Sequence, residues 1–243
     1  MKKILSAIRK ADQQFNMINP NDKIAVGLSG GKDSLLLLYS LSLYKHFSKN
    51  PFELSAIMLG LDQSPVPDKV KDFCDKINVE LIYQPTDIKE IVFDIRKEKN
   101  PCSLCAKLRR GILHSEAKKI GYDKVALGHH REDVLETMLL SLFFESRMHV
   151  FSPLQYLDRS DITLIRPMVY VPENDIINNV KKLDLPVVTN PCPANGYTKR
   201  QDMKELLKSF NNIIGGADAA ERMINALSKT DEYKLWDKIT RKD

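Results

Sequence analysis

Residues 24–34 read Ile24-Ala25-Val26-Gly27-Leu28-Ser29-Gly30-Gly31-Lys32-Asp33-Ser34. An apolar strand therefore runs directly into a loop of small residues, and an apolar helix follows. Glycines lack a Cβ, so consecutive backbone N–H groups can converge on an anion, and the start of the helix adds its positive dipole end. Ser29, Ser34 and Lys32 add donors and charge. The stretch predicts a phosphate-binding loop made of Ser29, Gly30, Gly31, Lys32, Asp33 and Ser34.

The spacing of this loop differs from that of a Walker A loop, which has four residues between its glycines and Ser or Thr after its lysine. Here Gly30 and Gly31 are adjacent, and Asp33 follows Lys32. A plain glycine turn is the simpler interpretation, but such a turn does not require Ser, Lys, Asp and Ser around it. The motif resembles the pyrophosphate loop of the ATP pyrophosphatase (PP-loop) superfamily, whose members cleave ATP between the α and β phosphates and adenylate a substrate.

The bulk composition is that of an ordinary globular protein. The 243 residues carry a formal net charge of +5, which is compatible with a polyanionic partner without requiring one. The sequence has no apolar run long enough for a membrane span, and its N-terminus soon becomes charged at Arg9 and Lys10. We therefore expect a cytoplasmic protein without a membrane partner.

Apolar strands alternate with amphipathic helices along the chain. After a first helix near 2–16, we predict strands near 23–28, 53–60, 79–84 and 124–128, and helices near 33–48, 67–77, 103–119 and 132–146. The strands are apolar on both faces, which is typical of a parallel sheet. The predicted fold class is α/β, a Rossmann-like parallel sheet flanked by helices, with an N-terminal helix and a helical C-terminal extension.

The pattern changes after Arg166-Pro167. We predict an extended piece at 168–171, a helix at 172–183, a short extended run at 186–189, and helices from 199 onward that break at Gly215-Gly216. We divide the chain into a catalytic core at 1–170 and an extension at 171–243.

Polar residues follow the predicted strands at the edge where parallel sheets bind ligands. Leu59, Gly128 and His129 are expected to flank an adenosine or a reacting base. Mg²⁺ is expected on Asp33 or Asp133. Asp62 either orients the base or Mg²⁺, or is a solvated turn residue, and His129 and His130 are either general acid–base groups or structural donors. The predicted catalytic residues are Lys32, Asp33, Asp62 and Asp133.

Cys102 and Cys105 open a basic helix, where the helix dipole and nearby arginines favour thiolate. Cys192 lies in a proline-stiffened loop, whereas Cys74 is expected in the core. Three cysteines without an obvious fourth suggest a site left open at one position. An iron–sulfur cluster, zinc completed by a histidine, and redox-active or inert thiols are the interpretations that the residues leave open.

Several motifs together resemble the tRNA 2-thiocytidine synthetase (TtcA-like) family over about residues 1–210. They are the loop 29–34, Leu61-Asp62-Gln63, Pro101–Cys105 with Arg109-Arg110-Gly111, residues 128–133 with 135–137, Ile165-Arg166-Pro167 and the loop at Cys192. The family usually has Arg-Asp-Asp where this chain has Arg131-Glu132-Asp133. It often has a second cysteine after the third ligand, where Pro193-Ala194 stands here.

The resemblance implies ATP-dependent thiolation of an anticodon-loop cytidine at C2, with a 4Fe-4S cluster held by Cys102, Cys105 and Cys192. The implied partners are tRNA, ATP, Mg²⁺ and a sulfur donor such as a cysteine desulfurase, and a homodimer is compatible with the apolar C-terminal segment. Candidate RNA contacts are Lys107, Arg109, Arg110, Arg147, His149, Lys199, Arg200 and Lys204. The alternatives are thiolation of a tRNA uridine, an adenylating enzyme such as an anticodon lysine ligase or one acting on a small molecule, and a non-catalytic ATP-binding protein.

Overall fold

The computed structural model describes residues 1–97, 101–188, 199–214 and 218–229. Its centre is a six-stranded sheet in the order β3-β2-β1-β4-β6-β5. The strands are β1 (Asp22–Leu28), β2 (Phe52–Leu59), β3 (Glu80–Gln84), β4 (Lys124–Ala126), β5 (Leu154–Leu157) and β6 (Ile162–Ile165). Every pair is parallel except β5 with β6, which is antiparallel. The predicted α/β class with a parallel sheet is confirmed.

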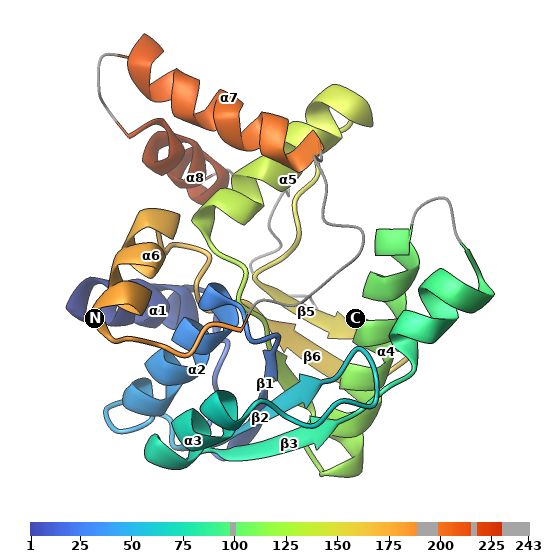
Figure 1. Ribbon diagram of the computed structural model, residues 1–243. Coiled ribbons are helices and arrows are strands. Elements are labelled where there is room, and N and C mark those ends of the chain that lie inside the picture. Colours follow the sequence, from blue (N-terminus) through green and yellow to red (C-terminus); the bar gives the residue numbers. More distant parts are fainter. Residues whose placement is uncertain (98–100, 189–198, 215–217, 230–243) are drawn as a thin grey trace.

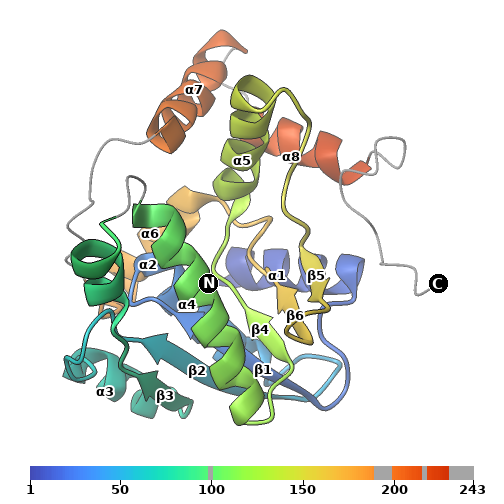
Figure 2. The same ribbon diagram turned by 90° about the vertical axis from the view of Figure 1, so that its right-hand side faces the viewer.

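Helices cover both faces of the sheet (Figures 1 and 2). They are α1 (Lys2–Phe15), α2 (Lys32–Tyr44), α3 (Asp68–Lys76), α4 (Pro101–Lys119), α5 (Arg131–Phe144), α6 (Glu173–Lys182), α7 (Lys199–Ile213) and α8 (Ala219–Lys229), with one π-helical turn, η1 (Glu90–Ile95). Along β1, Ile24 and Val26 belong to the core cluster shared with α1 and α2, whereas Ala25 belongs to the cluster shared with α4. Alternate residues of a strand point to opposite faces, so an apolar run buried on both sides is required here.

Two expectations about local structure are wrong. Residues 168–171 form a turn instead of an extended piece, because the N–H of Val171 donates to the carbonyl of Met168 at 2.8 Å. The strand at 124–128 ends at Ala126, and residues 127–130 carry the chain to the start of α5. The hairpin of β5 and β6 and the turn η1 were not predicted.

The C-terminal helices lie against the core. Helix α6 packs on α2, and α7 and α8 pack on α5 and on each other. The division between 170 and 171 stays a prediction, and the predicted break at Gly215-Gly216 lies outside the described residues. Among the helices in the described ranges, none has the length and apolar character needed to cross a membrane.

Candidate active site at the carboxyl edge of the sheet

The phosphate-binding loop is closed by its own serines. Ser34 Oγ donates to the carbonyl of Gly31 at 3.0 Å, accepts from the N–H of Ser29 at 3.1 Å, and lies 3.0 Å from Ser29 Oγ. Gly30 adopts φ +80°, a left-handed conformation that favours glycine. The N–H of Val188 donates to the carbonyl of Gly30 at 2.9 Å. The loop is therefore a preformed turn, and the hydrogen bond from Val188 ties it to a distant part of the chain.

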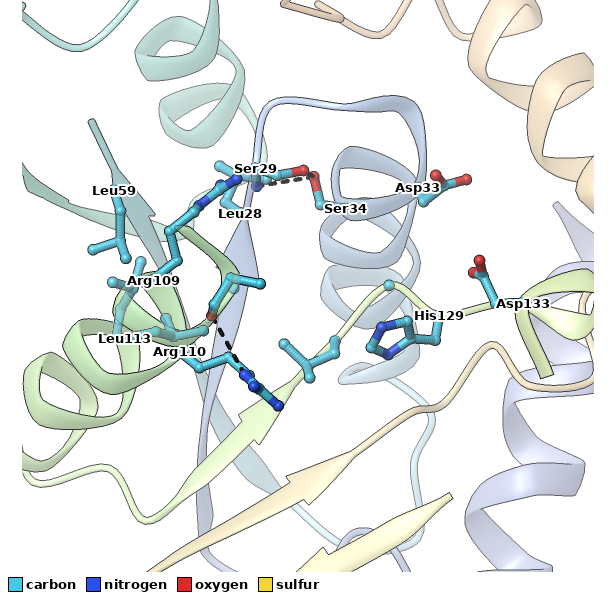
Figure 3. Close-up of a pocket in the computed structure, with 15 residues that line it drawn as sticks. Leu28, Ser29, Asp33, Ser34, Leu59, Arg109, Arg110, Leu113, His129 and Asp133 are labelled. Carbon is cyan, nitrogen blue, oxygen red and sulfur yellow. Dashed lines mark hydrogen bonds between the residues drawn. The ribbon is translucent and has the colours of Figure 1, made fainter. Parts of the chain in front are cut away.

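A cavity of about 470 Å³ opens beside this loop, a size that suits a small-molecule site (Figure 3). The predicted residues Ser29, Asp33, Ser34, Leu59, Gly128, His129 and Asp133 all line it, together with Gly27, Leu28, Ile57, Ala106, Arg109, Arg110, Leu113 and Leu127. Four separate stretches of sequence thus meet at one site. Gly30, Gly31 and Lys32 are not among the lining residues, and Asp62 lines a neighbouring cavity of about 170 Å³.

Gly128 lets the loop after β4 approach the start of α2. A Cβ built on Gly128 would lie 3.1 Å from the backbone carbon of Asp33 and 3.1 Å from the backbone nitrogen of Ser34. Such contacts are tighter than a side chain normally makes, and the neighbours cannot move aside easily because both are backbone atoms. The absence of a side chain at 128 therefore brings the two loops of the site together.

The side chain of Lys32 is held by carboxylates. Its Nζ lies 2.7 Å from Asp33 Oδ1 and 3.2 Å from Glu173 Oε1 on α6. Burial opposes the charge of Lys32, but the two carboxylates outweigh burial and raise its pKa. Glu173 also pairs with Lys204 of α7 at 2.7 Å. Glu173 was not predicted as a site residue, because its role depends on a contact between distant parts of the chain.

Asp33 and Asp133 face the same histidine. His130 Nε2 lies 3.9 Å from Asp33 Oδ1 and 3.5 Å from Asp133 Oδ2, and Arg200 Nη1 lies 3.0 Å from Asp133 Oδ1. Although His130 is buried, its hydrogen bond to Glu132 and the surrounding carboxylates raise its pKa. In the described ranges no three His, Cys, Asp or Glu side chains form a metal-binding group. Two carboxylates without a third match Mg²⁺, which usually takes its other oxygen ligands from phosphates and water.

Glu132, the residue at which the chain departs from the Arg-Asp-Asp pattern, joins two helices. Its Oε1 accepts from Arg131 Nη2 at 2.8 Å, and its Oε2 accepts from the backbone N–H of Glu173 at 2.8 Å and lies 3.2 Å from His130 Nδ1. These donors overcome burial and lower the pKa of Glu132 to about 2. The longer side chain thus links the start of α5 to the start of α6.

His129 is a neutral group in this site. Burial first, and the charge of Arg166 second, lower its pKa to about 4. A histidine with this pKa is unprotonated near neutral pH, which favours the structural-donor interpretation over a general acid. Its ring lies 4.9 Å from the ring of Phe151, centroid to centroid.

Four of the candidate basic residues form two groups. Arg109 and Arg110 line the cavity from α4, on the wall opposite Asp33 and Asp133 (Figure 3). Arg200 and Lys204 instead point at carboxylates, with Arg200 Nη1 lying 3.1 Å from the buried Glu136. Arg147 pairs with Glu145, and Lys199 Nζ lies 4.1 Å from the ring centroid of Phe144.

The two described candidate cysteines lie in the first turn of α4. Cys102 is exposed, and Cys105 is half-buried. Ala106 and Arg109, which follow on the same helix, line the cavity. Cys74 is fully buried in the core, as expected. Cys192 lies outside the described residues.

A known family matches most of the chain. The PP-loop domain matches residues 4–208 of this chain. The chain belongs to the PP-loop family. The predicted resemblance is confirmed.

Curated relatives of this PP-loop protein include the tRNA-cytidine(32) 2-sulfurtransferases of Aliivibrio fischeri and Pelobacter propionicus. The first is 37% identical over 88% of this chain and 71% of the relative. The second is 36% identical over 97% of this chain and 88% of the relative. Identity at this level over most of both chains places this protein in the same family.

Among solved structures, the fold is similar to that of the U34-tRNA thiolase NcsA from Methanococcus maripaludis, determined with its [4Fe-4S] cluster. The TM-score is 0.71 at 24% identity, over 93% of this chain and 79% of the thiolase. The NMN synthetase from Francisella tularensis is a more distant match, with a TM-score of 0.52 at 17% identity. Both similarities show the fold.

Proposed function

We propose that this protein is an ATP-dependent tRNA sulfurtransferase that converts an anticodon-loop cytidine into 2-thiocytidine. The observation that carries the proposal is that the PP loop and the helix bearing Cys102 and Cys105 line one cavity. Relatives named as tRNA-cytidine(32) 2-sulfurtransferases support the substrate and the reaction.

The reaction needs ATP because the C2 oxygen of cytosine is a poor leaving group. Adenylation at that oxygen makes AMP the group that departs, and pyrophosphate is released in the first step. The loop at 29–34 is suited to the pyrophosphate, since its N–H groups and the start of α2 favour an anion. Lys32 would exchange Glu173 for a phosphate oxygen, and Asp33 and Asp133 would hold Mg²⁺.

The cysteines fit a 4Fe-4S cluster with three protein ligands. Cys102 and Cys105 stand three residues apart on one side of α4, and we propose Cys192 as the third ligand. The N–H of Val188 donates to Gly30 of the PP loop, and Cys192 is four residues further along the chain, so its backbone stays within about 14 Å of Val188. When bound, such a cluster leaves one iron open for a sulfur ligand.

The walls of the cavity suit the other two reactants. Arg109 and Arg110 offer positive charge to RNA phosphates or to the adenylate, and bases of a single-stranded loop can be turned outward into a pocket. Asp62 lines the neighbouring cavity, where we propose that it helps to orient the base. We place the reaction in the cytoplasm, with a persulfide-generating enzyme such as a cysteine desulfurase as sulfur donor and a homodimer as the assembly.

A reconstituted reaction tests this function. Protein loaded with iron and sulfide under anaerobic conditions is incubated with ATP, Mg²⁺, sulfide and tRNA from a strain that lacks the gene, and the nucleosides are measured by mass spectrometry. We expect 2-thiocytidine with the wild type and with Ser103→Ala, a matched control between the two cysteines, but none with Cys102→Ala. Formation of a 2-thiouridine instead would overturn the assignment of the base. ATP turnover that tRNA does not stimulate would overturn the tRNA function.

A further inference from the structure

Arg166 is a buried cation whose hydrogen-bond partners are all neutral. It follows β6 directly, and only 6% of the residue is exposed. Nη1 donates to the carbonyl of Ser152, Nη2 lies 3.4 Å from Gln155 Oε1, and the guanidinium carbon lies 5.0 Å from the centroid of the Phe151 ring. Among the described residues, no carboxylate forms an ion pair with it.

The third nitrogen of the Arg166 guanidinium, Nε, faces His129. This nitrogen lies 3.2 Å from Nδ1 of that imidazole. A guanidinium always donates and never accepts, so Nδ1 must be the acceptor and cannot carry a hydrogen. The hydrogen of the neutral ring is therefore on Nε2.

The position of the pair connects it to the cavity. β4 and β6 are neighbouring parallel strands, and His129 and Arg166 lie just beyond their carboxyl ends. His129 lines the cavity, whereas Arg166 is not among the residues that line it. With Nδ1 occupied and one ring face against Phe151, Nε2–H is the group that the imidazole offers to a ligand.

We infer that Arg166 is a positioning residue that fixes His129 as the Nε2–H tautomer, so that His129 donates a hydrogen bond to a substrate oxygen in the cavity. This deepens the proposed function, because it assigns one fixed neutral donor to the nucleotide or base. When a substrate oxygen gains negative charge, a neutral donor can stabilise that oxygen, and the donor keeps its own proton.

Most of the charged groups around His129 favour the neutral ring. The charged groups that act on the ring are Arg166 from β6, Asp133 and His130 from the start of α5, and Arg200 from α7. Three of these four oppose a positive charge on His129 and only Asp133 favours one, so together with burial they keep the pKa low.

Nitrogen NMR of ¹⁵N-histidine-labelled protein tests the inference without any tRNA or sulfur chemistry. The sequence has only five histidines, so the signal of His129 is assigned by its loss in His129→Gln. We expect an Nε2–H tautomer that does not change between pH 8 and pH 5.5. A protonated ring or an Nδ1–H tautomer at pH 7 would overturn the inference.

The variant Arg166→Gln gives a second test of the inference by the same NMR measurement. Without the cation, the pKa of His129 should rise, although burial should still hold it below the ordinary histidine value. Arg166→Lys keeps the charge and should keep the low pKa. If His129 has the same tautomer and titration in Arg166→Gln as in the wild type, Arg166 does not position it.

The activity readout uses two replacements of His129. The amide of glutamine reaches the place of Nε2–H, whereas the amide of asparagine stands at the place of Nδ1. We expect His129→Gln to retain about tenfold more kcat than His129→Asn, because one hydrogen bond made in the transition state is worth about 1.4 kcal/mol. Equal kcat values for the two variants would contradict the donor role. Absence of thiolation by the wild type would refute the proposed function instead, and the NMR result would still decide the tautomer.

Discussion

Lys32 Nζ lies 3.2 Å from Glu173 Oε1, so a carboxylate of the C-terminal region holds the lysine of the phosphate-binding loop. Glu173 is also the partner of Lys204. Before ATP can use Lys32, the lysine must leave this carboxylate. Nucleotide binding and the packing of α6 and α7 are therefore coupled through one side chain.

Glu173→Gln should strengthen ATP binding. Removal of a partly buried ionic competitor is worth about 1 kcal/mol, which corresponds to a roughly fivefold lower Kd. Isothermal titration of the Mg²⁺–ATP complex measures the effect. Glu205→Gln, an exposed carboxylate on α7, is the matched control and should leave the Kd unchanged. A weaker affinity in Glu173→Gln would show that Glu173 assists the nucleotide instead of competing with it.

Gly128→Ala should damage the site through its backbone. The new Cβ would meet backbone atoms of Asp33 and Ser34 at 3.1 Å, so we expect a loss of about 1–3 kcal/mol in unfolding free energy, with weaker ATP binding. Gly111→Ala in α4 is the control. It has nothing within 4 Å of its added Cβ, and the higher helix propensity of alanine should stabilise it by about 0.5–1 kcal/mol. Urea denaturation distinguishes the two, and equal stability of both variants would contradict the close approach described here.

Glu132 should contribute stability that depends on pH. Its folded pKa of about 2 lies below the ordinary glutamate value of 4.5, so the contribution is present in full above about pH 5 and is lost as the pH falls toward 2. Glu132→Gln should therefore be less stable than the wild type at pH 7, by about 1–3 kcal/mol for a buried charge-assisted network. The difference should shrink on acidification. Thermal denaturation at several pH values checks this, and a gap that stays constant from pH 7 to pH 3 would contradict it.

Lys199→Glu should weaken tRNA binding and flatten its salt dependence. Lys199 is exposed, and among the described residues no carboxylate pairs with it, so it is available to a phosphate. Arg200, in contrast, is engaged by Asp133 and Glu136. Loss of one phosphate contact should lower the slope of log K against log salt by about one. Filter binding at several salt concentrations measures this slope. The same slope in Lys199→Glu and the wild type would remove α7 from the RNA interface.

The local sequence was sufficient to predict most of the fold and much of the site. Ile24 to Ser34 predicted the strand, the loop and the helix, because apolar periodicity and glycine placement act within a few residues of each other. Parallel strands place their carboxyl ends at one edge, which is why Leu59, Gly128, His129 and Asp133 could be expected to meet there.

What could not be predicted depends on contacts between distant segments. In the sequence, Glu173 is simply a charged residue near the start of a predicted helix. Only folding brings it to Lys32. Arg166 was predicted only as part of a family motif, because its role depends on the register of β4 beside β6. The interpretation of Arg200 as a plain RNA contact missed Asp133 and Glu136 for the same reason. β5 and β6 have only four residues each, too few for periodicity to distinguish them from a loop.

The most direct measurement is the thionucleoside profile of bulk tRNA from a strain that lacks this gene, complemented with the wild type, Cys192→Ala or the core variant Cys74→Ser. We predict that 2-thiocytidine disappears from the strain and returns with the wild type and with any Cys74→Ser protein that accumulates, but not with Cys192→Ala. A profile that is unchanged by loss of the gene would contradict the proposed function, and restoration by Cys192→Ala would contradict the three-cysteine site.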